Sequence, residues 1–261
     1  MIRSLWTGTT GMHSQQLNID VIANNLANVS TTGFKKSKAD FQDLLYQTMK
    51  VPGSQTSADT ESPTGILIGL GVKPAAVTKV FTQGDLILTE NELDVAIEGE
   101  GFLQVEQPNG NTGYTRTGAL KRDSNGRLTT SDGYPILPSI TIPDGSTQIS
   151  ISDTGIVSAR IGDDTTSTEL GTLELASFTN SAGLAAIGKN LFNETAASGT
   201  AQTGTPGDDG YGTLLQSYLE GSNVNIVEEL ANMITTQRAY EINSKTIQTS
   251  DEMMQTTNNL I

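Results

Sequence analysis

The sequence predicts an α+β fold in which long N- and C-terminal helices form a coiled-coil-like layer and a central all-β domain is inserted between them. Three observations lead to this prediction. Apolar residues recur at heptad spacing in the first helix-like block, heptad spacing returns after residue 225, and the chain between is rich in Gly, Thr and turn dipeptides. We therefore expect a terminal helical layer made of residues 1–33 and 223–261, an extended connecting arm at residues 34–70, and a central β domain at residues 71–222.

The first predicted helix carries a series of mainly apolar residues at alternating spacings of three and four. Gln15 is its clear polar member, and Gly33 is the expected C′ residue that ends the helix. About 27 residues at a rise of about 1.5 Å give a helix of ~40 Å. The series consists of Leu5, Gly8, Met12, Gln15, Ile19, Ile22, Leu26 and Val29.

The second predicted helix has a stricter repeat, in which mainly apolar residues stand seven apart up to the last residue. Asn225 followed by Glu228 indicates an N-cap with a capping box, and no Gly or Pro occurs after Gly221. We therefore expect one helix of ~55 Å from about Asn225 to the C-terminus. The repeat consists of Ile226, Met233, Tyr240, Ile247, Met254 and Ile261, and a companion series at Leu230, Gln237, Ser244, Asp251 and Asn258 begins apolar and turns polar.

The faces of these two helices allow two interpretations. In the simpler one, the helices pack on each other within one subunit. A helix pair leaves much of a narrow apolar seam uncovered, however, and isolated helix pairs are marginal in water. The first helix also carries many amide side chains outside its series, and amides can hydrogen-bond across helix interfaces without burying net charge. The second interpretation therefore adds partners from other subunits, which together form a polymer.

The middle of the chain has the pattern of short strands and tight turns, which is typical of an antiparallel barrel or sandwich. The β-rich runs are Gly71–Phe81, Leu93–Val105, Ile149–Ala159 and Leu170–Phe178, and the turn dipeptides are Asn109-Gly110, Asn125-Gly126, Asp132-Gly133 and Asp144-Gly145. Two segments differ from this pattern. Val51–Thr64 is poor in apolar residues and contains two prolines, so we expect a loop or an extended arm, and residues 196–212 are expected to form a Gly/Ser/Thr-rich surface loop.

Composition and charge exclude several classes of protein. The 261 residues include 15 Lys and Arg against 29 Asp and Glu, which gives a formal net charge of −14, and they include no cysteine. This argues against a nucleic-acid binder, a zinc finger, a disulfide scaffold and a thiol enzyme. The sequence has no apolar run of ~18 residues that could span a membrane, and its N-terminus lacks the apolar core of a cleavable signal peptide. An aromatic share of only 5 % indicates a thin core.

A search for catalytic, cofactor-binding and metal-binding patterns identifies no candidate site. His13 is the only histidine, and it lies in the first helix without a partner constellation. The two G-x-G fragments at residues 69–71 and 99–101 lack the third glycine of a dinucleotide fingerprint. The loop that starts at Asp123 resembles a calcium loop, but Arg127 occupies a ligand position, so a plain hairpin turn is expected. The acidic pairs Asp163-Asp164 and Asp208-Asp209 are expected to be solvated. We therefore predict a protein that is not an enzyme and has no cofactor.

Three blocks of sequence closely resemble the bacterial flagellar axial proteins of the rod and hook family. The first is the string NLANVSTTGF, the second is SNVNIVEE followed by QRAYEINSK near the C-terminus, and the third lies in the middle at DVAIEGEGF and YTRTG. The blocks occur in the family's order, and the resemblance covers the whole chain. The residues of the first block taken as the family signature are Asn25, Leu26, Ala27, Asn28, Thr31, Gly33 and Phe34.

Within this family the chain is most similar to the distal rod proteins. Hook proteins are considerably longer and carry an extra β domain, for which this chain has no room. The stretch Tyr46–Pro63 resembles the extended segment of distal rod subunits, which is held to stiffen the rod, and its markers here are Tyr46, Pro52 and Pro63. A proximal rod subunit or another axial protein of the hook family is the alternative within the family.

The resemblance implies a structural subunit that assembles into a rigid helical tube and transmits torque from the motor to the hook. In the family the terminal helices form an inner tube with the β domain outside it. The implied partners are further copies of the chain, proximal rod proteins, the hook protein or hook-side junction, the outer-envelope ring proteins and the flagellar type III export apparatus. The implied location is the distal rod of the basal body, which spans the periplasm and is exported without a cleavable signal peptide. The residues expected at the polymerisation interface are Leu5, Met12, Ile19, Ile22, Leu26, Val29, Ile226, Leu230, Met233, Tyr240, Ile247, Met254 and Ile261.

Two other classes of protein are weaker alternatives. A β-rich carbohydrate-active or adhesive surface protein would need an acidic pair or an aromatic platform in the middle of the chain, and neither is evident from the sequence. A peptidoglycan hydrolase joined to a rod domain would need a further domain with a catalytic acid, for which 261 residues leave no space.

Overall fold

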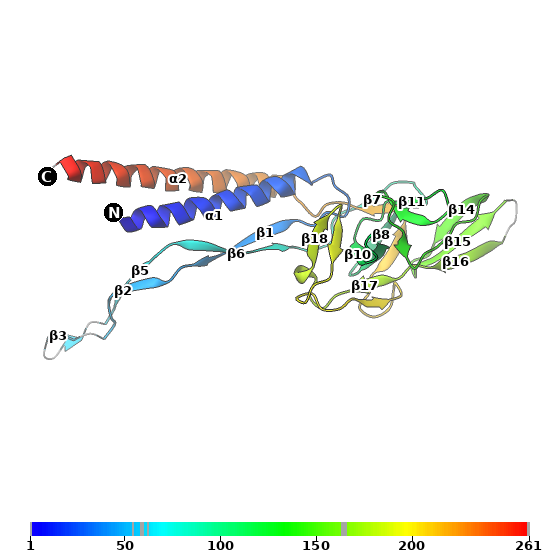
Figure 1. Cartoon of the computed structure of the whole chain (residues 1–261), viewed down its shortest axis with the longest axis horizontal. Helices are drawn as coiled ribbons and strands as arrows, with labels where there is room; N and C mark the ends of the chain where they lie inside the picture. The colour runs from blue at the N-terminus through cyan, green and yellow to red at the C-terminus, as the bar shows by residue number, and fades with distance from the viewer. Residues whose placement is uncertain (1, 54, 58–59, 62, 163–165, 260–261) are drawn as a thin grey trace. The chain divides into compact units, whose positions relative to one another are not determined.

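The computed structural model describes residues 2–53, 55–57, 60–61, 63–162 and 166–259 (Figure 1). Contacts divide the chain into two compact units. The first unit contains residues 1–26, 37–78 and 225–261, and the second contains residues 27–36 and 79–224. Helices at both ends of the chain and a β-rich middle confirm the predicted α+β class. Residues 71–78, which we predicted within the central β domain, belong to the first unit.

Helix α1 covers Ile2–Ala27. The prediction that it continues past Val29, with Gly33 as its C′ residue, is wrong, because residues 28–33 form turns instead. The amide of Thr31 donates to the Asn28 carbonyl at 3.1 Å, and the amide of Gly33 donates to the Glu220 carbonyl at 2.8 Å. A hydrogen bond to a distant part of the chain therefore replaces the helical bond that Gly33 would have made.

Helix α2 covers Ile226–Asn259, close to the predicted bounds. Asn225 is its N-cap, as predicted, because its side-chain Oδ1 accepts hydrogen bonds from the amides of Val227 at 3.0 Å and Glu228 at 3.3 Å. The reciprocal contact of a capping box stays a prediction. Among the described residues, no helix combines the length and the apolar character needed to cross a bilayer.

The two helices pack antiparallel to each other within the first unit (Figure 1). The contacts join Ser4 to Ser250, Gly8 to Ile247, Gly11 to Asn243, Asn18 to Thr236 and Asn25 to Glu229. Each later contact residue on α1 faces an earlier residue on α2, so the helices keep one antiparallel register. A Cβ on Gly8 or Gly11 would lie 3.0 Å from the facing side chain, so small residues allow the close approach.

The predicted arm at residues 34–70 contains strands that continue into a two-stranded ribbon of the first unit. Strand β1 pairs with β6, β2 pairs antiparallel with β5, and β3 pairs antiparallel with β4 (Figure 1). The bounds are β1 (Ser37–Asp43), β2 (Tyr46–Lys50), β3 (Gln55–Ser57), β4 (Thr60–Glu61), β5 (Ile66–Gly69) and β6 (Val72–Lys79). Val51–Thr64 therefore contains short strands in addition to loop, and residues 54, 58, 59 and 62 of that segment lie outside the described residues.

The second unit is built from short strands. Its largest sheet has the order β18-β19-β10-β9-β17-β20, with β13 also paired to β9, and β14-β15-β16 form a three-stranded sheet. Two-stranded pairs join β11 to β12, β21 to β8 and β22 to β7. The bounds are β7 (Leu86–Leu88), β8 (Val95–Glu98), β9 (Phe102–Glu106), β10 (Thr112–Thr115), β11 (Leu120–Arg122), β12 (Leu128–Thr130), β13 (Ile136–Leu137), β14 (Ser146–Ile151), β15 (Ile156–Ile161), β16 (Ser167–Thr172), β17 (Leu175–Ser177), β18 (Ala185–Gly188), β19 (Leu191–Asn193), β20 (Gln202–Gly204), β21 (Thr213–Gln216) and β22 (Tyr218–Glu220), with a 3₁₀ turn at Ser181–Gly183.

Three of the four predicted β-rich runs are each divided between two strands. The run Leu93–Val105 contains β8 and β9, because Gly99 and Gly101 lie between them with φ values of 108° and 134°. The run Ile149–Ala159 includes parts of β14 and β15, which turn at Gly155 with φ 85°. Such φ values suit glycine and interrupt a strand. The run Leu170–Phe178 spans the end of β16 and β17, and only Gly71–Phe81 holds one strand, β6.

The core of the second unit has an aliphatic part and an aromatic part. The aliphatic part is centred on β8, β9 and their neighbours and includes the fully buried side chains of Leu103, Leu173 and Leu175. In the aromatic part, Phe102 contacts Phe81, Phe178 and Phe192 edge-on at centroid distances of 5.4–6.1 Å. Four of the six phenylalanines of this chain therefore lie in one cluster, where such pairs add to the energy of burial.

Candidate assembly site

The residues that we predicted at an interface on α1 are partly covered within the chain. Ile22 is buried, while Leu5, Met12, Ile19 and Leu26 are half-buried. Val29 lies beyond the end of the helix and is half-buried. Apart from Gly8, the α1 residues of the contact pairs described above stand one position before this apolar series, at Ser4, Gly11, Asn18 and Asn25. Much of the apolar series thus keeps area that contacts within α1 and α2 do not cover.

The predicted repeat on α2 lies on or beside the face that contacts α1. Met233, Ile247 and Met254 are half-buried, Tyr240 and Ile226 are more exposed, and Ile261 lies outside the described residues. The companion line of contacts differs from our expectation by one residue. It consists of Glu229, Thr236, Asn243 and Ser250, in place of the series that begins at Leu230. Small or polar side chains fit this line because Ser, Gly and Asn residues stand opposite them on α1.

The first turns of α2 carry an exposed apolar stripe that sequence reasoning missed in part. Val227 is 77 % exposed, Leu230 is 43 % exposed and Ile234 is 60 % exposed. Their spacing of three and four places them on one helix face. Only Leu230 was among the predicted interface residues. The sequence does contain the pattern, because Val227, Leu230 and Ile234 form a second apolar series next to the strict heptad repeat. Trp6 on α1 is another large apolar side chain that is mostly exposed.

Asn25 of the signature links three elements of the first unit. Its side-chain Oδ1 accepts a hydrogen bond from the Ser37 amide at 2.8 Å, and its Nδ2 donates to the Ser37 carbonyl at 2.9 Å. The same Nδ2 donates to Glu229 Oε2 of α2 at 3.4 Å. Asn25 and Glu229 are both buried. Only an amide supplies the donor and the acceptor that this geometry needs, so Asn25 fixes the end of α1 to β1 and α2.

Gly33 and Phe34 of the signature pack into the second unit. Gly33 has φ 68°, and a Cβ there would lie 2.8 Å from the Thr117 backbone nitrogen, so the position excludes larger residues. Phe34 is buried, and Lys79 Nζ lies 4.4 Å from the centre of its ring. The signature side chains Asn28 and Thr31 hydrogen-bond to each other at 3.2 Å in the turn that follows α1. The signature thus encodes a turn and its anchor.

A buried ionic cluster lies directly after the signature and consists of Lys35, Arg116 and Glu220, which we call the ionic trio. Lys35 Nζ lies 2.5 Å from Glu220 Oε1, and Arg116 Nε lies 3.6 Å from Glu220 Oε2. Their side chains are at most 4 % exposed. Lys35 Nζ also donates to the Thr82 carbonyl at 2.7 Å, and the Gly84 amide donates to Glu220 Oε1 at 3.0 Å. Sequence reasoning missed the trio, although all three residues lie in or beside the blocks that carry the resemblance.

Burial disfavours the charged forms of the two cations in the ionic trio. Burial lowers the pKa of the Lys35 ammonium, while its hydrogen bond to the Glu220 carboxylate acts in the other direction. Burial also lowers the pKa of the Arg116 guanidinium, against the attraction of Glu220 and Glu100. Nearby, burial lowers the pKa of Lys79. One carboxylate is thus shared by two buried cations.

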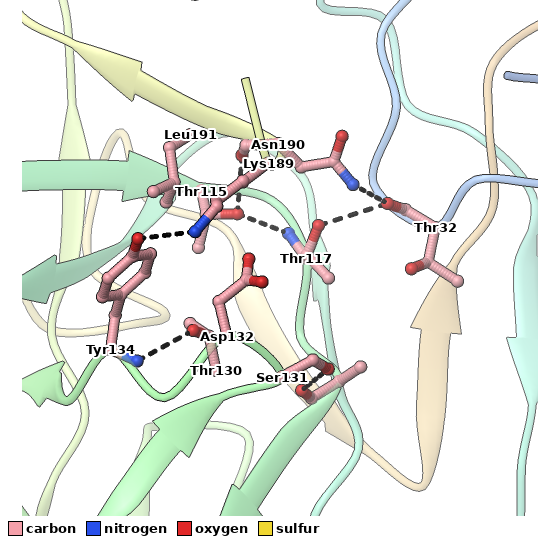
Figure 2. A pocket seen from close by; sticks show the side chains of 11 residues that line it. Thr32, Thr115, Thr117, Thr130, Ser131, Asp132, Tyr134, Lys189, Asn190 and Leu191 are labelled. Carbon is pink, nitrogen blue, oxygen red and sulfur yellow. Dashed lines mark hydrogen bonds between the residues drawn. The ribbon is translucent and has the colours of Figure 1, made fainter. Parts of the chain in front are cut away.

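A pocket of about 260 Å³ in the second unit is lined largely by hydroxyl and other polar side chains (Figure 2). Lys189 Nζ donates to the Tyr134 hydroxyl at 2.8 Å, and this bond raises the pKa of Lys189. Asn190 Nδ2 and Thr117 Oγ1 both donate to the Thr32 carbonyl, at 3.1 and 3.2 Å. The hydrogen bonds around this pocket thus fasten the turn that holds Thr32 to two segments of the β domain.

The markers of the predicted stiffening arm lie on the ribbon or near its tip. Tyr46 is exposed in β2, where it pairs with Gly69 of β5, and a Cβ on Gly69 would lie 3.4 Å from the tyrosine ring. Pro52 and Pro63 are exposed. Exposed apolar side chains gather on β2, β5 and the residues beside them, and they include Leu45, Met49, Val51, Ile66 and Leu67. This ribbon therefore presents more apolar area than its composition suggested.

The residues that we set aside as unsuited to chemistry occupy ordinary positions. His13 is exposed on α1. The Asp123 loop is the predicted hairpin turn, because the Gly126 amide donates to the Asp123 carbonyl at 2.9 Å between β11 and β12. Asp208 caps a turn by accepting from the Thr205 hydroxyl. Asp163 and Asp164 lie outside the described residues. Within the described part of the chain, no group of three His, Cys, Asp or Glu residues could hold a metal ion.

Comparison with protein families assigns the three blocks of sequence. The family model described as flagella basal body rod protein matches residues 5–35. The model described as flagellar hook protein FlgE/F/G D1 domain matches residues 96–159. The model described as flagellar basal body rod FlgEFG protein C-terminal matches residues 215–260.

Curated relatives are similar over the full chain. The flagellar basal-body rod protein FlgG of Buchnera aphidicola subsp. Schizaphis graminum is 52 % identical over 255 residues, which is 98 % of each chain. FlgG of Borreliella burgdorferi is 52 % identical over 262 residues, which cover 100 % of this chain and 99 % of the relative. FlgG of Bacillus subtilis is 40 % identical over 265 residues, with 100 % and 99 % covered.

Proposed function

The chain belongs to the FlgG family of flagellar basal-body rod proteins, and from this premise we propose how it acts as a structural subunit of the distal rod. Identity of about half the residues over the full length supports the rod assignment over a longer hook protein. The observation that carries the mechanism is the apolar area that α1 and α2 leave exposed. A subunit of this kind lowers its free energy by burying that area against further copies of itself.

We infer that the terminal helices form a coiled-coil-like polymerisation layer. The constant antiparallel register of α1 and α2 supports a preformed helix pair in each subunit. The interface residues are Leu5, Met12, Ile19, Ile22, Leu26, Val29, Ile226, Leu230, Met233, Tyr240, Ile247, Met254 and Ile261. Val227 and Ile234 join them, because they extend the exposed stripe around Leu230. One heterologous contact that is repeated without closing a ring generates a helical tube.

We propose that this tube is a rigid drive shaft that transmits torque from the motor to the hook. Its neighbours along the axis are proximal rod proteins and the hook protein or hook-side junction. It turns inside the ring proteins of the outer envelope and reaches its place in the periplasm through the flagellar type III export apparatus. The net charge of −14 supports a surface that does not adhere to the rings.

The proposed role is structural, so we expect no catalysis and no cofactor. Membership of a rod protein family supports this assignment. We also propose that the segment with Tyr46, Pro52 and Pro63 stiffens the rod. Support comes from the exposed apolar side chains that gather on the same ribbon, since these can be buried against other subunits.

Electron microscopy of the concentrated protein tests the proposal. The full chain is expected to form filaments or tubes. A variant that lacks residues 248–261 loses two heptads with Met254 and Ile261, as well as the contact of Ser250 with Ser4. This variant is expected to stay soluble with a folded β domain and to form no filaments. If it still formed rods, the terminal helices would not be the polymerisation layer.

A further inference from the structure

The ionic trio joins two connections of the second unit, residues 33–36 at the end of the first signature block and residues 220–224 just before α2. Lys35 belongs to residues 27–36 and Glu220 belongs to residues 79–224 of the second unit, and the two are separated by 185 positions. Around them, the Gly33 amide donates to the Glu220 carbonyl at 2.8 Å, and the Lys36 amide donates to Asn223 Oδ1 at 2.7 Å. The trio therefore stands at the centre of a short stretch in which the two connections lie side by side.

Asn223 extends this arrangement to the segment that follows β6. Its Nδ2 donates to the Val80 carbonyl at 2.8 Å and to the Thr82 carbonyl at 3.1 Å. The Val80 amide in turn donates to the Lys36 carbonyl at 2.9 Å. The Thr82 carbonyl is also the acceptor for Lys35 Nζ. Three chain segments of the second unit thus converge on the same buried charges.

Three buried charged side chains are not the residues expected to give this site the greatest stability. Two cations share one carboxylate, and Arg116 Nε, Arg116 Nη1 and Glu220 Oε2 have no hydrogen-bond partner among the described residues. Replacing a buried ion pair by apolar side chains of similar volume is often neutral or stabilising. A buried charge cluster instead favours one arrangement over its alternatives, because any shift in register leaves a charge unpaired at high cost.

We propose that the ionic trio is a clamp that fixes the register of the two connections at residues 33–36 and 220–224, and that load enters the β domain through this clamp. The second part rests on the proposed role of the chain as a torque-transmitting subunit. Apolar packing resists sliding weakly because it has no preferred direction. A buried carboxylate between two cations resists sliding because a displacement of one residue separates the charges.

Native-state hydrogen exchange of the full chain tests the clamp. The main variant replaces all three charges at once, as Lys35→Met, Arg116→Met and Glu220→Met, so that no charge is left buried alone. The reporters are the amides of Gly33 and Lys36, because their acceptors, the Glu220 carbonyl and the Asn223 side chain, remain in the variant. We expect the urea midpoint to be kept while exchange of these two amides accelerates about tenfold or more relative to core amides.

Two further variants make the test specific. Glu220→Gln leaves two buried cations without a counter-charge and is expected to lower the urea midpoint strongly. Arg122→Gln removes an exposed ion pair with Asp144 in the same domain and is expected to change neither the midpoint nor the reporters. The clamp is refuted if Gly33 and Lys36 exchange at the wild-type rate in the triple variant, or if all amides accelerate together.

The load-transmitting part of the proposal has its own measurement. Cells that carry the triple variant are expected to assemble rods but to rotate a tethered bead with lower torsional stiffness. Normal stiffness with accelerated exchange would refute the transmission of load through the clamp. Failure of the wild-type chain to form filaments would instead refute the proposed function, and the exchange experiment on the monomer would still decide the clamp.

Discussion

Removing the exposed stripe on α2 should abolish assembly without unfolding the subunit. The perturbation is the triple substitution Val227→Ser, Leu230→Ser and Ile234→Ser. These side chains stand on one face of α2 and are 77 %, 43 % and 60 % exposed in the isolated chain. Val227 and Ile234 have most of their area in water, so the loss of either should change the free energy of unfolding of the monomer by no more than about 0.5 kcal/mol. Leu230 has more than half of its area covered within the chain, and its loss should cost about 1–2 kcal/mol, which a folded subunit can tolerate.

The cost to assembly follows from the area that remains available. Full burial of a Val, Leu or Ile side chain is worth about 1.5–3 kcal/mol. Scaled by the exposed fractions, the three side chains can together contribute about 4 kcal/mol when a neighbouring subunit covers them. A factor of ten in an equilibrium constant corresponds to about 1.4 kcal/mol. Because ordering of the interface offsets part of this gain, we expect the critical concentration for polymerisation to rise about 100-fold or more.

Sedimentation of the assembled fraction over a range of protein concentrations measures this change. The control is the substitution Asn232→Ser, Gln237→Ser and Gln248→Ser, which alters three exposed polar residues of the same helix. It should leave the critical concentration unchanged. Circular dichroism and urea unfolding establish that both variants stay folded. A critical concentration within about threefold of the wild-type value in the stripe variant would refute the assignment of this face to the interface.

Three further predictions concern the stability of the subunit and the shape of the rod. Gly33→Ala should lower the free energy of unfolding, measured by urea titration, by about 3 kcal/mol or more, because the backbone is left-handed and the new Cβ would lie 2.8 Å from the Thr117 nitrogen. The control Gly110→Ala has positive φ but open space around the new Cβ, so it should cost only about 1–2 kcal/mol. The pKa of Lys35 is lower in the folded chain than its ordinary value of 10.5, so between these two values the unfolded chain binds more protons. The free energy of unfolding of the wild type should therefore rise with pH in this range relative to that of Lys35→Met. Curves of unfolding free energy against pH that run parallel for the two proteins would contradict this prediction. Deletion of residues 51–64 should leave polymerisation possible but alter rod stiffness or curvature in electron micrographs, and complete loss of assembly would point to a core contact.

Local patterns in the sequence were sufficient to predict the two helices and the turns of the β domain. The start of α2 depends on Asn225 and on a repeat that needs no distant residue. The dipeptide Asn109-Gly110 predicts its turn because glycine accepts the positive φ of 79° that the turn requires. The paired strands β1 and β6 were not recognised as one ribbon, since β1 carries no clear alternation of buried and exposed residues.

The candidate site was only partly predictable for the same reason. The strict heptad repeat of α2 identified Met233, Ile247 and Met254, which are half-buried beside α1. It did not reveal that Glu229 would be buried opposite Asn25, because helical periodicity alone favours apolar residues in such a place.

The fold class, the family and the helices that we assign to assembly follow from the amino-acid sequence alone, because spacing and signature strings are properties of neighbouring residues. Which faces of α1 and α2 meet, and which charges are buried, depends on the folded chain. Lys35 and Glu220 are 185 positions apart, and nothing in the local sequence of either residue indicates that it has a buried partner. The pairing follows from the chain topology that brings the two signature blocks together, and in a low-dielectric interior that proximity sets the energy of the charges.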